Sequence, residues 1–223
     1  DRATLETVQL ARLKTTIQQA SRAPFYAKRL AEAGVSADNL RSLEDIRRIP
    51  FTSKDDLRSQ YPYGLATVPH SEFVRMHCSS GTTGTPVAVC YTQPDINSWA
   101  DLMARCLYMA GVRKDDVFQN MSGYGLFTGG LGIHFGAERL GCMTIPAGAG
   151  NSKRQLKLVK DFGTTVAHIL PSYALHLGTT LIEEGEDPKA LSLRIACVGA
   201  EPYTEETRRR IEALFDMKVY NSY

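Results

Sequence analysis

The run Ser79–Pro86, with the sequence SSGTTGTP, gathers the residue types that bind an oxyanion. Its hydroxyl donors, which can reach phosphate oxygens, are Ser79, Ser80, Thr82, Thr83 and Thr85. Gly81 and Gly84 permit positive φ angles and close approach of the backbone. Successive N–H groups in such a turn form a concave anion site, and Pro86 fixes the exit into the next segment. The run therefore predicts a phosphate-binding loop.

Two better-known phosphate loops do not fit this sequence. The pattern GxxxxGK[ST] is absent, and the run leads into a predicted strand at 87–91 rather than a helix. Gly148 and Gly150 begin a dinucleotide-binding fingerprint, but Lys153 occupies its third glycine position. A run of Ser, Thr and Gly is also typical of a flexible turn. The regular order and the flanking strands favour the binding loop.

A second glycine-rich run, Gly123–Gly130 with the sequence GYGLFTGG, follows a predicted strand at 116–121. Its glycines separate Tyr124 and Phe127, so backbone and ring faces could press against a flat apolar ligand. A turn whose aromatic side chains cover the core explains the pattern equally well. His134 follows on the predicted helix. Since the sequence assigns it no partner, we expect a packing histidine.

A third segment, Val198–Pro202 with the sequence VGAEP, ends another predicted strand. Its Gly-Ala step leaves backbone groups free to face a nucleobase. Glu201 has an alternative explanation, because the dipole of a helix beginning near Thr204 favours a carboxylate there.

The elements that must position these segments follow two patterns. Residues 3–20, 25–34 and 52–57 have helical periodicity. From residue 73 onward, predicted strands alternate with predicted helices of 10 to 15 residues, which favours βαβ units. The strands are expected at 73–78, 87–91, 116–121, 142–145, 165–170, 194–198 and 218–220. We predict an α/β protein, with a helical region over 1–70 and a mostly parallel sheet flanked by helices over 71–223.

The last predicted strand lies close to the end of the sequence. Ligands in open α/β sheets bind outside the carboxyl ends of the strands, and Asn221-Ser222-Tyr223 lies at such an end. We therefore expect this subdomain to be truncated and its catalytic residues to lie beyond Tyr223.

Composition excludes several classes of function. A net charge of +2 and a pI of about 8.3 give no electrostatic case for nucleic acid or an anionic membrane. The five cysteines form no CxxC pair, so we expect reduced thiols in a cytoplasmic protein. No apolar stretch approaches the roughly 20 residues that span a bilayer.

SSGTTGTP resembles the phosphate-binding loop of the adenylate-forming superfamily, which includes acyl-CoA synthetases, luciferases and peptide-synthetase adenylation domains. That motif is usually followed by Lys, where this chain has Val87, and the phenylacetate–CoA ligase branch often carries Lys where this chain has Thr85. The loop thus lacks a fixed cation on either side of Pro86 but keeps its backbone N–H groups. The run Gly123–Leu140, GYGLFTGGLGIHFGAERL, closely resembles the phenylacetate–CoA ligase family.

This resemblance implies an AMP-forming ligase that joins phenylacetate or another aromatic acid to CoA through an acyl-adenylate, with ATP, Mg²⁺ and CoA taking part. It implies that Ser79–Thr85 bind the ATP phosphates, and that an acid pocket is lined by Tyr124, Gly125 and Phe127. It implies an adenine site formed by Gly199, Ala200, Glu201, Pro202 and Tyr223. The elements that hold magnesium, ribose and the catalytic lysine would lie beyond the sequence, with no metal ligand within it. A homodimer is expected by analogy.

Two alternatives remain. The chain could belong to a ligase that adenylates another acid, such as the acidic tail of a deazaflavin coenzyme. It could also be a non-catalytic nucleotide-binding domain whose helical region forms a dimer surface. Whether the parent enzyme is a phenylacetate ligase or a ligase for another acid, we expect residues 1–223 alone to bind nucleotide weakly and not to catalyse turnover.

Overall fold

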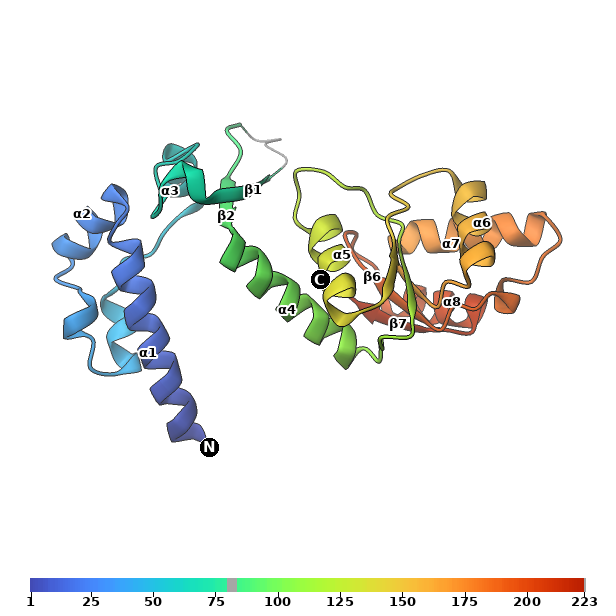
Figure 1. Cartoon of the computed structure of the whole chain (residues 1–223), viewed down its shortest axis with the longest axis horizontal. Helices are drawn as coiled ribbons and strands as arrows, with labels where there is room; N and C mark the ends of the chain where they lie inside the picture. The colour runs from blue at the N-terminus through green and yellow to red at the C-terminus, as the bar shows by residue number, and fades with distance from the viewer. Residues whose placement is uncertain (80–83, 223) are drawn as a thin grey trace. The chain divides into compact units, whose positions relative to one another are not determined.

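The computed structural model describes residues 1–79 and 84–222 (Figure 1). The chain forms two compact units, Asp1–Gln93 and Pro94–Tyr223. The sequence places the change from the helical region to the α/β region near residue 70, whereas the compact units divide after Gln93. The difference arises because a two-stranded hairpin belongs to the first unit.

The first unit is mainly helical. Its elements are α1 (Arg2–Ala20), α2 (Pro24–Glu32), η1 (Ala37–Asn39), η2 (Leu43–Arg48), α3 (Lys54–Ser59), η3 (His70–Glu72), β1 (Phe73–Cys78) and β2 (Ala88–Thr92). Its small core is made by the buried side chains Ile17, Leu30, Val35 and Leu40. Pro24 begins α2, where its fixed φ suits a helix and its missing N–H costs nothing.

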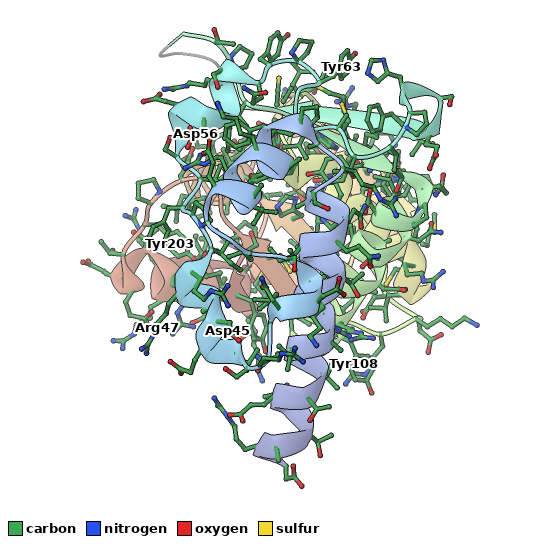
Figure 2. The ribbon with its side chains drawn as sticks, turned by 90° about the vertical axis from the view of Figure 1, so that its left-hand side faces the viewer. Asp45, Arg47, Asp56, Tyr63, Tyr108 and Tyr203 are labelled. Atoms are coloured by element: carbon green, nitrogen blue, oxygen red, sulfur yellow. The ribbon has the colours of Figure 1, made fainter. Side chains whose placement is uncertain are left out.

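Side-chain caps define the short helices of this unit. The Ser53 hydroxyl accepts from Asp56 N, and the Asp56 carboxylate accepts from Ser53 N, so α3 begins with a reciprocal capping box. The Asp45 carboxylate similarly accepts from Ser42 N at the start of η2. Figure 2 labels both aspartates. Because η1 and η2 depend on such local polar bonds rather than on apolar periodicity, the sequence pattern did not predict them.

The hairpin is antiparallel, with Met76 opposite Cys90 and Cys78 opposite Ala88. Its strands agree with the predicted strands at 73–78 and 87–91 within one residue. The two strands of the hairpin therefore flank the Ser79–Pro86 run in the sequence.

The second unit is a five-stranded parallel sheet with the strand order β4-β3-β5-β6-β7, which confirms the predicted α/β class. The strands are β3 (Val117–Asn120), β4 (Met143–Ile145), β5 (Val166–Ile169), β6 (Ile195–Val198) and β7 (Lys218–Asn221). The helices are α4 (Gln93–Met109), α5 (Gly129–Leu140), α6 (Ser152–Phe162), α7 (Pro171–Glu183), η4 (Pro188–Ala190) and α8 (Glu205–Phe215).

Each face of this sheet has its own core, because successive side chains of a strand point to opposite faces. On β6, Ile195 and Cys197 pack with residues of α4 and α5, whereas Ala196 and Val198 pack with residues of α6, α7 and α8. Every residue of β5 and β6 is buried, as expected for central parallel strands covered on both faces.

An ion pair joins the amino ends of three strands. The Asp116 carboxylate accepts from Arg194 Nε at 2.9 Å, from Thr165 Oγ1 at 2.7 Å and from Arg113 N at 2.7 Å. Burial alone would raise the pKa of Asp116, but the hydrogen bonds from Arg194, Arg113 and Thr165 hold it below its usual value. These contacts stabilise the edge of the sheet opposite to the strand carboxyl ends.

Candidate nucleotide and acid site

Two of the predicted site segments follow strand ends at one edge of the parallel sheet. The Gly123–Gly130 run follows β3, and the Gly199–Pro202 run follows β6. Because parallel strands end at the same edge, the fold brings both segments to the carboxyl edge of the second unit, where ligands bind in open α/β sheets.

A buried polar cluster lies at the end of β3. The Asn120 side chain is fully buried, and its Oδ1 accepts from Ser122 Oγ at 2.8 Å and from Ser122 N at 3.2 Å. Its Nδ2 donates to Gly130 O at 3.0 Å. His168, on the neighbouring strand β5, places Nδ1 2.9 Å from Asn120 Oδ1 and 3.0 Å from Ser122 Oγ. The sequence patterns assigned a role to none of these side chains.

Burial lowers the pKa of His168 to about 4. The imidazole is therefore neutral at pH 7. A hydrogen on Nδ1 satisfies the acceptor Asn120 Oδ1, so the neutral ring fits its surroundings without a counter-charge.

The aromatic residues of the Gly123–Gly130 run have different environments. Tyr124 is partly buried, and its hydroxyl lies 3.1 Å from His134 Nδ1. Phe127 is 48% exposed, and its ring lies beside Gly125 and Gly129. The ring is therefore held by its own loop rather than by the core, and a role in binding acid stays a prediction.

His134 has two partners that our sequence analysis missed. Besides Tyr124, its Nε2 lies 3.1 Å from the Glu138 carboxylate, one helical turn away on α5. The spacing of four residues between His134 and Glu138 was the available signal. Burial raises the pKa of Tyr124, a hydrogen bond with Asn120 opposes that rise, and the charge of Glu138 adds to it. Tyr124 thus stays a neutral phenol at pH 7.

The Gly199–Pro202 segment is shaped by close backbone contacts. A Cβ atom at Gly199 would lie 2.5 Å from Ser222 Oγ, so this position needs glycine. Ala200 has a φ of 68°, which is uncommon for a residue with a side chain. The Glu201 carboxylate accepts from Ser172 Oγ at 2.9 Å and from Ser172 N at 3.3 Å. Glu201 therefore contacts the first turn of α7, a partner that the sequence did not indicate.

The buried side-chain amides of Gln119 and Gln155 hold the loop that follows β4. Gln155 Nε2 donates to Gly148 O at 2.6 Å, and Gln119 Nε2 donates to Gln155 Oε1 at 2.7 Å. Gly148 and Gly150 have φ angles of 71° and 78°. The two glycines thus serve a tight turn rather than a dinucleotide fingerprint.

The Ser79–Pro86 run is described at its two ends. Ser79 N donates to Val87 O at 3.0 Å, and Val87 N donates to Ser79 Oγ at 3.0 Å, which closes the base of the turn. Gly84 has a φ of 121°, as the glycine pattern predicted, and Thr85 is exposed. The predicted phosphate-binding residues Ser80, Gly81, Thr82 and Thr83 lie outside the described residues, as does Tyr223.

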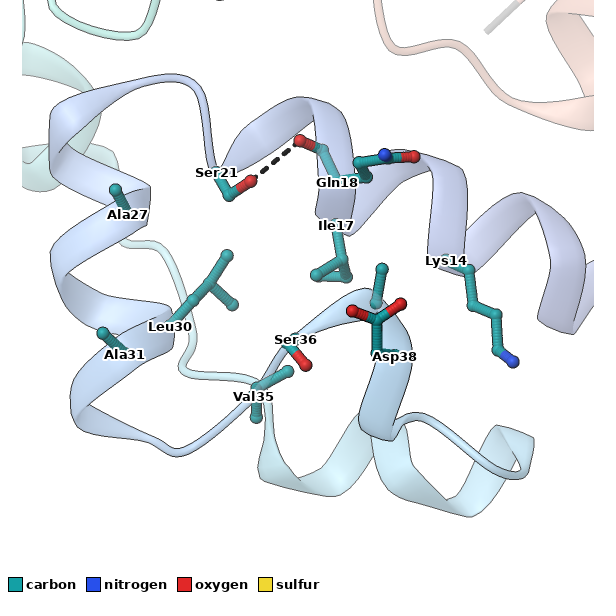
Figure 3. A pocket seen from close by; sticks show the side chains of 11 residues that line it. Lys14, Ile17, Gln18, Ser21, Ala27, Leu30, Ala31, Val35, Ser36 and Asp38 are labelled. Atoms are coloured by element: carbon teal, nitrogen blue, oxygen red, sulfur yellow. Dashed lines mark hydrogen bonds between the residues drawn. The ribbon is translucent and has the colours of Figure 1, made fainter.

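Two cavities among residues 1–79 and 84–222 have none of the predicted site residues in their lining. One of about 670 Å³ lies in the first unit between α1, α2 and η1, with Lys14, Leu30 and Asp38 among its lining (Figure 3). Another of about 440 Å³ lies at the amino ends of β6 and β7, beside Arg194 and Lys218.

Within residues 1–79 and 84–222, no three His, Cys, Asp or Glu side chains gather as a metal site would require. No helix in the same ranges has the length and apolar character needed to cross a membrane.

Comparison with known proteins defines the class. Residues 9–223 match the family model described as AMP-binding enzyme, and the chain belongs to this family.

The most similar curated relatives include the phenylacetate-coenzyme A ligase of Pseudomonas putida, which is 48% identical over 96% of this chain. The enzyme of the same name from Thermus thermophilus is 45% identical over the whole chain. Among solved structures, a 2-hydroxyisobutyryl-CoA ligase in complex with 2-HIB-AMP and CoA has a TM-score of 0.90 and 33% identity over 99% of this chain. The chain spans about half the length of each, 49%, 50% and 49% respectively.

Proposed function

We propose that the protein containing this chain is an AMP-forming acid–CoA ligase whose substrate is phenylacetate or a close aromatic relative. The observation that carries this proposal is the similarity of nearly the whole chain to phenylacetate-coenzyme A ligases at 45% and 48% identity. The partly buried Tyr124 and the exposed ring of Phe127, both on one glycine-rich loop, support a flat apolar acid.

The reaction has two steps. In the first, a carboxylate oxygen of the acid attacks the α-phosphorus of ATP, a P–O bond forms, and pyrophosphate leaves. In the second, the CoA sulfur attacks the carbonyl carbon of the acyl-adenylate, its proton goes to solvent, and AMP leaves. The first step needs little proton transfer; it needs two anions held in line and charge stabilised on phosphoryl oxygens.

The proposed roles of the residues follow from their chemistry. The backbone N–H groups and hydroxyls of Ser79–Thr85 would hold the phosphates. The Gly199–Pro202 backbone would face the adenine, with Tyr223 stacked on it. Tyr124, Gly125 and Phe127 would line the acid pocket. Mg²⁺ bound with ATP would neutralise phosphate charge.

A second candidate is a ligase for a smaller or more polar acid. The observation in its favour is the TM-score of 0.90 to an enzyme whose structure contains 2-HIB-AMP. The acidic tail of a deazaflavin coenzyme is a further substrate of this kind.

We also propose that the enzyme works in the cytoplasm as a homodimer. The five free thiols support that compartment, and the dimer rests on analogy.

The test is an acid panel assayed with the full-length protein, MgATP and CoA. We expect kcat/KM for phenylacetate to exceed that for 2-hydroxyisobutyrate, acetate and glutamate by at least about a hundredfold, because one apolar pocket gains roughly 1–3 kcal/mol from each well-packed group. CoA thioester formation would be measured. A preference for 2-hydroxyisobutyrate or glutamate would select the second candidate, and nucleotide binding without turnover of any acid would favour a non-catalytic domain.

A further inference from the structure

Asn120 occupies an unusual place relative to the Gly123–Gly130 run. It is the last residue of β3, its exposure is 0%, and it lies on the same face of the sheet as Phe118, which packs against α5. A buried carboxamide needs partners for both its oxygen and its nitrogen. Its partners are the two ends of the loop that follows, Tyr124 within that loop, and His168 on β5.

One side of the amide holds the start of the loop. Asn120 Oδ1 accepts from Ser122 Oγ at 2.8 Å and from Ser122 N at 3.2 Å. The neutral ring of His168, whose Nδ1 lies 2.9 Å away, fixes the same oxygen from β5.

The other side holds the end of the loop. Asn120 Nδ2 donates to the carbonyl oxygen of Gly130, in the first turn of α5. The two ends also touch directly, since a Cβ atom at Gly130 would lie 2.2 Å from Gly123 O. The loop is therefore closed at a narrow neck, and the amide connects the two sides of that neck.

Burial does not hold the tip of this loop. Leu126 is 59% exposed and Phe127 is 48% exposed, so apolar packing fixes their positions only in part. The hydrogen bonds at the neck restrain the loop together with the bond between Tyr124 and His134. Asp in place of Asn120 would keep the size, lose the donor to Gly130 and place a carboxyl group beside His168.

We propose that Asn120 is a positioning residue for acid selection: by closing the neck between Ser122 and Gly130, it sets where Tyr124 and Phe127 stand and so which acids fit. This inference rests on the proposed function, in which these two rings line the acid pocket. It predicts that loss of the neck bond changes recognition of the acid and leaves recognition of ATP in place.

The test compares Asn120→Asp with a matched control in the full-length protein. The control, Thr165→Val, removes a hydrogen bond to Asp116 at the opposite edge of the sheet. Acid-dependent ATP–pyrophosphate exchange gives KM for phenylacetate and for MgATP. For Asn120→Asp we expect KM for phenylacetate to rise about tenfold and the preference for phenylacetate over acetate to fall by a similar factor, since a buried group left unpaired costs roughly 1–3 kcal/mol. KM for MgATP should stay within about twofold. The control should leave KM for phenylacetate, KM for MgATP and the preference for phenylacetate over acetate unchanged.

The outcomes separate the two proposals. A wild-type protein without acid-dependent exchange would refute the ligase function itself. An active Asn120→Asp variant with unchanged acid KM and preference would refute the role of Asn120, as would an equal loss with every acid. If that variant does not fold, Ser122→Ala decides, because it removes the bonds of Ser122 Oγ to Asn120 and His168 and leaves the bond from Asn120 Nδ2 to Gly130. A smaller shift in the same direction supports the role, and no shift overturns it.

Discussion

At the scale of single residues, His168 links the sheet to the Gly-rich loop without carrying charge. Its ring lies between Asn120 and Ser122, and burial holds its pKa near 4. Protonation of the ring in the folded protein would place a charge in a buried site that offers no carboxylate among its hydrogen-bond partners. Lowering the pH should therefore reduce the stability of the fold through protonation of His168.

The predicted pH dependence follows from the sign of that shift. An unfolded chain has a His pKa near 6.5, so between pH 6.5 and 4 it binds a proton that the folded protein does not. Stability must then fall as pH falls through this window. We expect His168 to account for a loss of about 2 kcal/mol in the free energy of unfolding between pH 7 and pH 5. Urea unfolding at both values would measure it.

His168→Gln is the comparison for this measurement, because it removes the titrating ring and keeps a polar side chain. The variant should lose less stability than the wild type over the same interval. Equal losses in the two proteins would show that His168 does not titrate in this window.

At the scale of elements, α5 approaches α4 more closely than ordinary side chains allow. A Cβ atom at Gly136 would lie 2.4 Å from Met103 Cβ, and one at Gly132 would lie 2.5 Å from the Trp99 ring. The two glycines thus let α5, which begins at the end of the Gly123–Gly130 run, sit close against its neighbour. Close packing here fixes where the loop ends.

Gly136→Val should separate these two helices. We expect a loss of about 2–3 kcal/mol in the free energy of unfolding, because part of the clash is with backbone, which cannot rotate away. Thermal or urea unfolding measures it. Arg139→Val, on the exposed side of the same helix, introduces the same side chain and breaks only a surface ion pair with Asp101, so its cost should stay within about 1 kcal/mol. Similar losses for both variants would contradict the packing argument.

The elements themselves could largely be predicted from the sequence. The predicted strands at 194–198 and 142–145 differ from β6 and β4 by at most one residue, because apolar runs between Gly and polar breaks have few alternative structures. The 3-10 helices η1 and η2 could not be predicted, since three to six residues are too few to show a helical period.

The side-chain contacts of the candidate site could be predicted only in part. The Gly123–Gly130 and Gly199–Pro202 runs follow β3 and β6, as the sequence pattern predicted. The bonds of Asn120 to His168 and of Ser172 to Glu201 join residues 48 and 29 positions apart, and no local pattern encodes such pairs. His134 and Glu138 are the exception, since their spacing was visible in the sequence.

At the scale of the whole molecule, the predicted machinery is divided between the two units. The Ser79–Pro86 run belongs to the first, and the Gly123–Gly130 and Gly199–Pro202 runs belong to the second. The proposed reaction assigns the ATP phosphates to the Ser79–Pro86 run and the acid to the Gly123–Gly130 run. The phosphate-binding role of the Ser79–Pro86 run is the central claim.

The most direct test is phenylacetate-dependent ATP–pyrophosphate exchange without CoA, comparing the full-length wild type with Gly84→Val. Gly84 has a φ of 121°, which valine does not adopt without strain, so the substitution reshapes the turn. Gly185→Val supplies similar backbone strain at a φ of 78° in an exposed turn outside the predicted site.

We predict exchange that requires phenylacetate, a loss of at least about a hundredfold in Gly84→Val, and near wild-type exchange in Gly185→Val. Full exchange by Gly84→Val, or wild-type exchange that is indifferent to the acid, would contradict the claim that this run holds the phosphates at the site where the acid is activated.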